Sequence, residues 1–380
     1  MYITGVGRTR FGKLQESLSE LSRIATEHAL EDASMDIHDI DAIYVSNFCA
    51  GPMQHQLHLN ALMADALKIW GIPIVRVETA CASGGAALHQ GTLVSQTYRN
   101  ILVIGVERLT DNPKMAIEGL SMAADRVSDQ LNGLIFPAAY ALIASQYMKR
   151  YGVTLRDLAY VSYKNHSHAN MNEYAQFYSK RLTMRDIMNS PVVCSPLRLY
   201  DCSPISDGAC AIIITNKKRN NRDVRIAASA LSTGSLTITN LQDLTSFPAA
   251  VLSAKKAYTQ AGLRPKDIDI ASVHDCFTVA EMIAMEDVGL CVRGDAKSLI
   301  RKKKTWYTGA MPVNTDGGLK ANGHPIGASG LAQIFELVTQ LRGEAGERQV
   351  KNARLALAHN IGGVGGTAVI HILESGQKYI

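Results

Sequence analysis

Short apolar runs alternate along the chain with longer segments in which apolar residues recur every three or four positions. The runs Ile72 to Glu78 and Ile101 to Val106 are rich in isoleucine and valine, and they predict buried strands. Between them, the apolar residues from Ala86 to Val94 fit one side of a helix of roughly four turns. The order strand, tight turn, helix, strand is typical of an α/β protein.

This arrangement of elements occurs twice in the chain. Asp39-Ile40-Asp41 precedes one predicted strand, and Asp267-Ile268-Asp269 precedes another. The turn Cys81-Ala82-Ser83-Gly84 has a counterpart in Gly327-Ala328-Ser329-Gly330, and each opens a predicted helix. Such spacing indicates an internal duplication, so we expect two α/β halves, each with about five strands.

The segment from Thr110 to Leu199 has no counterpart in the second half. It predicts helices at Ala138 to Arg150 and at Leu155 to Asn170, and we interpret it as an insertion that carries substrate and subunit contacts. The predicted domains are therefore residues 1–111 with 200–222, the inserted residues 112–199, and residues 223–380.

Composition excludes several classes of protein. The chain has 380 residues, is 47% hydrophobic and carries a net charge of +5, with no dense basic stripe, so we expect no nucleic-acid partner. No apolar run reaches the ~18 residues that cross a bilayer, and the N-terminal residues lack the apolar segment of a signal peptide. Seven cysteines without close pairs suit a reducing compartment. We therefore expect a cytoplasmic protein without a membrane partner or a metal site.

Cys81 is the first candidate for chemistry. It lies on the turn between the strand and the helix, where free backbone N–H groups and the helix dipole are expected to lower a thiol pKa from its usual value of about 8.5. The residues that follow it, Ala82 to Gly85, are small enough to let a bulky substrate reach the sulfur. This position favours a nucleophile over a buried structural thiol.

Three further segments carry polar groups at the ends of second-half elements, where open α/β sheets bind ligands. They are His274-Asp275-Cys276-Phe277, Gly323-His324-Pro325 and the glycine-rich stretch from Ala358 to Gly366. Together with Cys81 they supply a thiol, two histidines, a second thiol and backbone amides. Acyl transfer through a thioester needs this set of groups.

With these motifs the chain resembles the thiolases over nearly its whole length. Cys81 in its turn is similar to their acyl-accepting cysteine, and Gly323-His324-Pro325 is similar to their activating-histidine motif. The motifs His274 to Phe277 and His359-Asn360-Ile361-Gly362 resemble those of the sterol-carrier-protein type and its archaeal and bacterial relatives. The resemblance implies the thiolase fold: two duplicated βαβαβαββ halves in a layered α-β-α-β-α core, with an inserted loop domain.

The resemblance also implies roles for the catalytic residues. Cys81 would carry the acyl group, His324 would take the Cys81 proton, and His274 would stand in an oxyanion hole. Backbone N–H groups of Cys81 and Gly362 would form a second oxyanion hole. Most thiolases have a catalytic cysteine where this chain has Asn360, so we assign the second acid/base to Cys276.

Other positions are expected to contact substrate or to modify the pocket. We expect Ser253, Asn314 and Asn360 to contribute to substrate binding. Asp316 stands where many relatives have a serine. We expect its carboxylate to alter loop packing or pocket polarity, and so to affect chain-length preference rather than activity.

The implied activity is reversible thiolytic cleavage of 3-ketoacyl-CoA, or the Claisen condensation of an acyl-CoA with acetyl-CoA. Coenzyme A is then a substrate, and no cofactor is called for. The resemblance also implies a homodimer or homotetramer, and a small zinc-ribbon/oligonucleotide-fold protein as a possible partner. The alternatives left open are a non-catalytic or channelling subunit that handles CoA esters and a decarboxylating ketosynthase.

Overall fold

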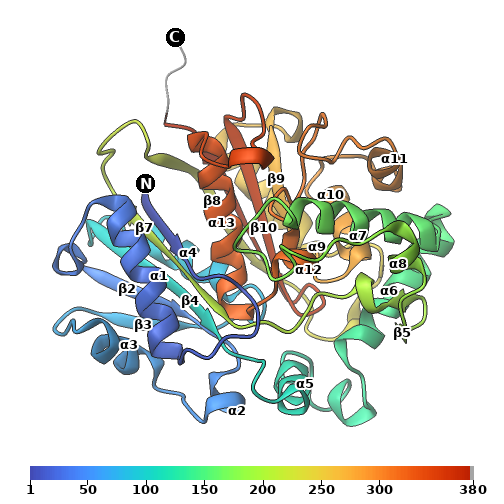
Figure 1. Ribbon diagram of the computed structural model, residues 1–380, viewed down its shortest axis with the longest axis horizontal. Helices are drawn as coiled ribbons and strands as arrows, with labels where there is room; N and C mark the ends of the chain where they lie inside the picture. Colours follow the sequence, from blue (N-terminus) through green and yellow to red (C-terminus); the bar gives the residue numbers. More distant parts are fainter. Residues whose placement is uncertain (377–380) are drawn as a thin grey trace.

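The computed structural model describes residues 1–376, whose strands form one mixed sheet of nine and a separate hairpin (Figure 1). The nine-stranded sheet has the order β3-β2-β4-β7-β1-β8-β11-β10-β9. Its strands are β1 (Tyr2–Arg8), β2 (Ala42–Ser46), β3 (Ile74–Val77), β4 (Asn100–Glu107), β7 (Gly208–Thr215), β8 (Val224–Thr233), β9 (Ile270–Val273), β10 (Leu355–Gly362) and β11 (Thr367–Glu374). The hairpin pairs β5 (Val192–Cys194) with β6 (Leu197–Arg198).

The sheet consists of two halves with the same topology, as the duplication predicts. In the first half β2 is parallel to β3 and β4, and β7 is antiparallel to β4 and β1. In the second half β9 is parallel to β10, and β11 is antiparallel to β10 and β8. An isolated parallel bridge between Ala271 and Val313 stands where β3 stands in the first half. The halves meet where β1 pairs with β8.

Thirteen α-helices are present in the described residues. Some cover the outer faces of the sheet, and others lie between its two halves. They are α1 (Leu18–Ala33), α2 (Ala50–Gln54), α3 (Leu59–Leu67), α4 (Ser83–Leu93), α5 (Pro113–Ser121), α6 (Phe136–Tyr151), α7 (Leu155–Ala169), α8 (Met184–Met188), α9 (Pro248–Ala261), α10 (Thr278–Asp287), α11 (Ala296–Arg301), α12 (Gly318–Asn322) and α13 (Ile326–Arg342). None of them is long and apolar enough to cross a membrane.

The two helices that follow the duplicated turns, α4 and α13, form the central layer. Helix α13 is buried on nearly all sides, because its apolar residues pack against strands of both halves. The two helices approach closely at Gly84, where a Cβ atom would come within 3.0 Å of Gly327 O. Helix α1 covers the outer face of the first half, and α9 covers that of the second. These layers confirm the predicted α-β-α-β-α core.

The insertion is helical, as predicted. The expected helices at 138–150 and 155–170 are α6 and α7, and α5, α8 and the β5–β6 hairpin complete the segment. Residues of α6 and α7 pack with residues of the α10 and α11 segments in one apolar cluster. The inserted segment is therefore anchored to the second half, next to the strand that ends just before His274.

Two predictions about the first turn were wrong in detail. The run Ile72 to Glu78 was expected to be a buried strand, but β3 is the edge of the sheet and Val75 is 46% exposed. Apolar composition does not tell an edge strand from a central one. The helix after Cys81 ends at Leu93, about three turns long, and Leu93 is 62% exposed rather than packed on the apolar side.

Candidate active site

The structure brings Cys81, His274 and His324 together from three separate segments. Cys81 lies in the bend between β3 and α4, His274 follows β9, and His324 lies between α12 and α13. The Cys81 sulfur and one ring nitrogen of each histidine all lie within 4.8 Å of one another. The two imidazole rings meet edge to face, with their centroids 5.3 Å apart. At this separation a thiol and an imidazole can exchange a proton through one bridging water or after a small side-chain movement.

A tight bend presents the Cys81 sulfur. Ala80 has φ 51°, a left-handed conformation that is uncommon for a residue with a side chain. The Ser83 hydroxyl stabilises the bend, since it donates to Ala80 O at 2.6 Å and accepts from Thr79 N–H at 2.9 Å. The Cys81 and Gly363 N–H groups both donate to the sulfur. The sequence predicted Gly362 N–H as part of the second oxyanion hole, and that role stays a prediction. The N–H that contacts the sulfur belongs to Gly363, the next residue.

Hydrogen bonds fix which nitrogen of His324 can act as a base. The Ser329 hydroxyl donates its single proton to Pro325 O at 2.9 Å. The same oxygen lies 2.7 Å from His324 Nδ1, so Nδ1 must carry the proton and donate to Ser329. Nε2 then keeps its lone pair and is free to accept a proton from Cys81.

Asn360 fixes the tautomer of His274 in the opposite sense. The Gly85 N–H, an obligatory donor, lies 3.2 Å from Asn360 Oδ1, so the amide nitrogen faces the other way. Asn360 Nδ2 donates to Cys81 O at 2.9 Å and to His274 Nδ1 at 3.1 Å. His274 Nδ1 is therefore an acceptor, which leaves the proton on Nε2. His274 can then donate a hydrogen bond to a developing oxyanion.

Cys276 is the second thiol of the site. It is buried, and its sulfur is close enough to Cys81 for the Cys81 thiol to raise the pKa of Cys276. Burial raises the pKa of Cys276 well above its usual range, while hydrogen bonds from Phe277 N–H and the Tyr140 hydroxyl lower it. At rest Cys276 is thus a neutral thiol with donors placed around its sulfur.

Burial dominates the protonation of the other members of the site as well. It raises the pKa of Cys81 to about 12, against the lowering by the Gly363 N–H. It lowers the pKa of His324 to about 3, and that of His274 well below its usual range. The expectation that the helix N-terminus would lower the Cys81 pKa was wrong, because removal from water outweighs the dipole. The resting site is a neutral thiol beside neutral imidazoles.

The same three residues are the one group of possible metal ligands among residues 1–376. A thiolate and two imidazoles are ligands that zinc accepts. A metal ion held there would occupy the sulfur and both nitrogens to which the resemblance assigns roles in acyl transfer. The arrangement therefore fits acid–base chemistry without a metal.

Two of the residues expected to bind substrate are engaged with protein groups. Ser253 is fully buried and its hydroxyl donates to Ala368 O at 3.0 Å. Asn314 is also fully buried, and it accepts from Val273 N–H at 2.8 Å and donates to Glu281 at 2.8 Å. Asn314 thus holds the end of β9, and the contribution of both side chains to substrate binding stays a prediction.

Asp316, the departure from the family pattern, packs its own loop. Its carboxylate accepts from Gly318 N–H at 2.9 Å and from Asn322 Nδ2 at 2.5 Å. Asn322 in turn accepts from the buried Arg8 at 3.0 Å. The carboxylate therefore supports α12, the helix that leads to His324.

Three residues that sequence reasoning missed support this geometry: Glu107, Tyr140 and Ser329. Ser329 had a signal, because it lies in the second copy of the duplicated turn. Glu107 ends an apolar run, and both of its oxygens accept hydrogen bonds, from Asn47, Phe48, Cys49 and Gly327. Tyr140 had no signal in the sequence, since its contact with the second half depends on how the insertion folds back.

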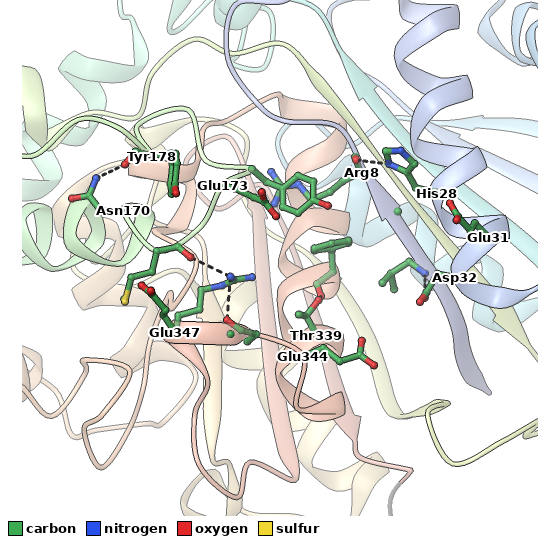
Figure 2. Close-up of a pocket in the computed structure, with 18 residues that line it drawn as sticks. Arg8, His28, Glu31, Asp32, Asn170, Glu173, Tyr178, Thr339, Glu344 and Glu347 are labelled. Atoms are coloured by element: carbon green, nitrogen blue, oxygen red, sulfur yellow. Dashed lines mark hydrogen bonds between the residues drawn. The ribbon is translucent and has the colours of Figure 1, made fainter.

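A surface cavity of about 750 Å³ lies away from this centre, between α1, the segment around Tyr174 and the C-terminal end of α13 (Figure 2). Its lining includes five carboxylates, from Glu31, Asp32, Glu173, Glu344 and Glu347. They outnumber the two arginines of the lining, Arg8 and Arg348, so the net negative charge repels phosphate groups. The cavity is therefore an unsuitable place for the phosphorylated part of coenzyme A.

The fold and this Cys–His–His–Cys arrangement define an acyltransferase of the thiolase type, and comparison with known proteins agrees. Family profiles described as "Thiolase, N-terminal domain" and "Thiolase C-terminal domain-like" match residues 1–218 and 230–375. The chain belongs to the thiolase family.

Among its relatives is an acetyl-CoA acetyltransferase of Methanothermobacter thermautotrophicus, 43% identical over 98% of both chains. Sterol carrier protein 2 of Bos taurus is 31% identical over 99% of this chain and 72% of its own length. A solved structure described as an Ltp2-ChsH2(DUF35) aldolase matches with a TM-score of 0.85 and 25% identity, covering 99% of this chain and 98% of that one.

Proposed function

We propose that this thiolase is an acetyl-CoA acetyltransferase that works through an acetyl group on Cys81. The observation that carries the proposal is the convergence of Cys81, His274 and His324 within 4.8 Å, with tautomers that make one histidine a base and the other a donor. The acetyl-CoA acetyltransferase of Methanothermobacter thermautotrophicus, with its 43% identity, supports acetyl-CoA as the substrate.

In the degradative direction the first step cleaves the carbon chain. His324 Nε2 takes the proton of Cys81, and the sulfur attacks the keto carbon of acetoacetyl-CoA. The bond between C2 and C3 of the substrate breaks, and its electron pair forms the enolate of acetyl-CoA. Cys276 gives its proton to that enolate. Acetyl-CoA then leaves. The enzyme keeps an acetyl group on Cys81, a proton on His324 and a thiolate at Cys276.

The second step transfers the acetyl group to free coenzyme A. The thiol of coenzyme A gives its proton to the Cys276 thiolate, and its sulfur attacks the acetyl carbon. Cys81 leaves as a thiolate and recovers its proton from His324. Nε2–H of His274 donates to the thioester oxygen, and the Cys81 amide, with Gly362 as its expected partner, faces the second oxyanion. His324 returns the Cys81 proton, and the coenzyme A proton replaces the one that Cys276 gave to the enolate, so both thiols are restored. The synthetic direction is the reverse sequence.

The covalent intermediate tests this proposal. Incubation with acetyl-CoA should add one acetyl mass to the peptide that contains Cys81, and Cys81→Ala should abolish the addition. The Cys202→Ala variant is a matched control, since Cys202 is a partly buried thiol that bonds to Arg198 O. Acetylation that persists in Cys81→Ala would remove Cys81 from the mechanism.

We also propose that the chain forms a dimer through the first half, or a tetramer. The support is the edge strand β3, whose unpaired backbone is a template for a second copy. Val75 on this strand is exposed, and so are the apolar side chains of Leu57, Trp70 and Leu93 in the same half. Sedimentation at micromolar concentration should show the oligomer, and Val75→Glu should weaken it. Wild-type protein that sediments only as a monomer would refute this proposal.

The second candidate function is a subunit that channels CoA esters to a partner protein. It is supported by the solved structure with a TM-score of 0.85, whose description couples Ltp2 with ChsH2(DUF35). A small zinc-ribbon/oligonucleotide-fold protein is the partner that we propose. Turnover of acetoacetyl-CoA and coenzyme A by the chain alone would refute a requirement for it. We propose a cytoplasmic location, which the seven unpaired thiols support.

A further inference from the structure

Tyr140 reaches from the insertion into the catalytic centre. It lies on α6, its side chain is fully buried, and its ring stacks on Phe277 with centroids 4.5 Å apart. Its hydroxyl donates to Gly363 O at 3.1 Å and lies close enough to the Cys276 sulfur to lower the pKa of that thiol. The hydroxyl thus lies between the Cys276 sulfur and Gly363, the residue whose N–H contacts the Cys81 sulfur.

The hydroxyl has one proton for two acceptors. When Cys276 is a thiol, the better acceptor is the Gly363 carbonyl, and the thiol can donate weakly to the Tyr140 oxygen. When Cys276 is a thiolate, the charged sulfur is the stronger acceptor. Burial raises the pKa of Tyr140 well above its usual range, so the hydroxyl remains a donor throughout.

We propose that Tyr140 is a positioning residue for Cys276, and that rotation of its O–H from Gly363 O to the sulfur stabilises the thiolate each time Cys276 gives up its proton. The inference deepens the proposed function, because it rests on Cys276 as the second acid/base. No bond forms or breaks at Tyr140, whose proton stays on its own oxygen.

The surroundings of Cys276 show why such a donor is needed. Three ionisable groups face the sulfur: Cys81 from the first turn, Asp275 beside it on the same loop, and Tyr140 from α6. Cys81 and Asp275 both oppose a negative charge on Cys276, and burial opposes it further. Apart from the Phe277 N–H, the Tyr140 hydroxyl is the group that favours the thiolate.

The test is a direct titration of Cys276 in the full-length protein. In a Cys81→Ser background, the rate at which iodoacetamide alkylates the Cys276 peptide reports its thiolate fraction as a function of pH. Adding Tyr140→Phe keeps the ring on Phe277 and removes only the hydroxyl. Because hydrogen bonds to charged groups are the strong ones, the alkylation midpoint should rise by about one to two pH units.

Tyr147→Phe is the matched control. Tyr147 lies two turns further along α6, is also buried, and donates to Glu286 Oε1 at 2.6 Å, so this variant loses a buried hydroxyl away from the sulfur. It should leave the alkylation midpoint unchanged. With Cys81 intact, Tyr140→Phe should lower turnover about 10- to 100-fold at pH 7, while Cys81 is still acetylated by acetyl-CoA, because coenzyme A can leave as a thiolate without the Cys276 proton.

The outcomes separate this inference from the proposed function. An alkylation midpoint in Tyr140→Phe equal to that of its parent, or an equal shift in Tyr147→Phe, would overturn the role of Tyr140. If Cys276→Ala turns over like wild type, the acid/base assignment fails instead, whatever the titration shows. A raised midpoint with reduced turnover in Tyr140→Phe alone supports both.

Discussion

Replacing Glu107 by glutamine should destabilise the protein strongly, although the two side chains have nearly the same shape. Glu107 is fully buried at the end of β4. One oxygen accepts from Asn47 Nδ2 at 2.8 Å and Cys49 N–H at 2.9 Å. The other accepts from Phe48 N–H at 2.9 Å and Gly327 N–H at 3.0 Å. The carboxylate therefore ties the first half to the second copy of the duplicated turn.

The magnitude follows from counting these donors. In Glu107→Gln one of the two oxygens becomes an NH₂ group, and in either orientation two N–H donors then face it. Each buried donor left without an acceptor costs about 1–3 kcal/mol, so the loss in the free energy of unfolding should be about 2–6 kcal/mol. Burial raises the pKa of Glu107 to about 7, and an assay at pH 8 therefore compares the amide with an ionised carboxylate.

Urea denaturation at pH 8 measures this loss, with Glu27→Gln as the control. Glu27 forms an exposed pair with Arg23 at 2.6 Å, so its variant should stay within about 0.5 kcal/mol of wild type. Glu107 also raises the pKa of Cys81, so Glu107→Gln should make Cys81 alkylation faster at a given pH. A Glu107→Gln protein as stable as the control would refute the reasoning.

Two further predictions concern the histidines. Ser329→Ala removes the acceptor that holds the proton on His324 Nδ1, so the rate of Cys81 acetylation should fall about 10-fold, measured by quenched-flow mass spectrometry; an unchanged rate would show that Ser329 does not set the tautomer. Acidification should unfold the protein between about pH 6 and 4, followed by circular dichroism. The cause is a set of buried histidines whose pKa values are lowered by burial: His166, His168, His274, His324, His359 and His371. The unfolded chain binds their protons below pH 6.5 and the folded chain does not, so each histidine costs about 1.4 kcal/mol per pH unit in that range. A structure unchanged at pH 4 would contradict this account.

The sequence was sufficient to find the duplicated halves, because corresponding strands and turns repeat the same apolar spacing. It also identified Cys81, His274 and His324 as groups that would meet, since all three lie at the ends of elements that a doubled α/β fold brings to one place. The family profiles confirmed membership of the thiolase family, and the structure confirmed the helical insertion.

Protonation could not be predicted from the local sequence. The pKa of Cys81 depends on how completely β10 and its glycine loop cover the turn, and Gly363 and Asn360 lie far from Cys81 in the chain. The same reason explains why Tyr140 was missed. Its hydroxyl meets Gly363 only after α6 folds back onto the second half. Local patterns describe elements, whereas desolvation and proton sharing arise from contacts between distant segments.

The division of labour between the two thiols is the central claim, and one variant tests it most directly. Cys276→Ala should lower acetoacetyl-CoA thiolysis by about 10²–10⁴-fold, the usual contribution of a general acid or base. The same protein should still acquire one acetyl group on Cys81 from acetyl-CoA, because His324 activates the sulfur and coenzyme A can leave as a thiolate without the Cys276 proton. Thiolysis at the wild-type rate in Cys276→Ala would contradict the assignment and transfer the role to His359 or a water molecule.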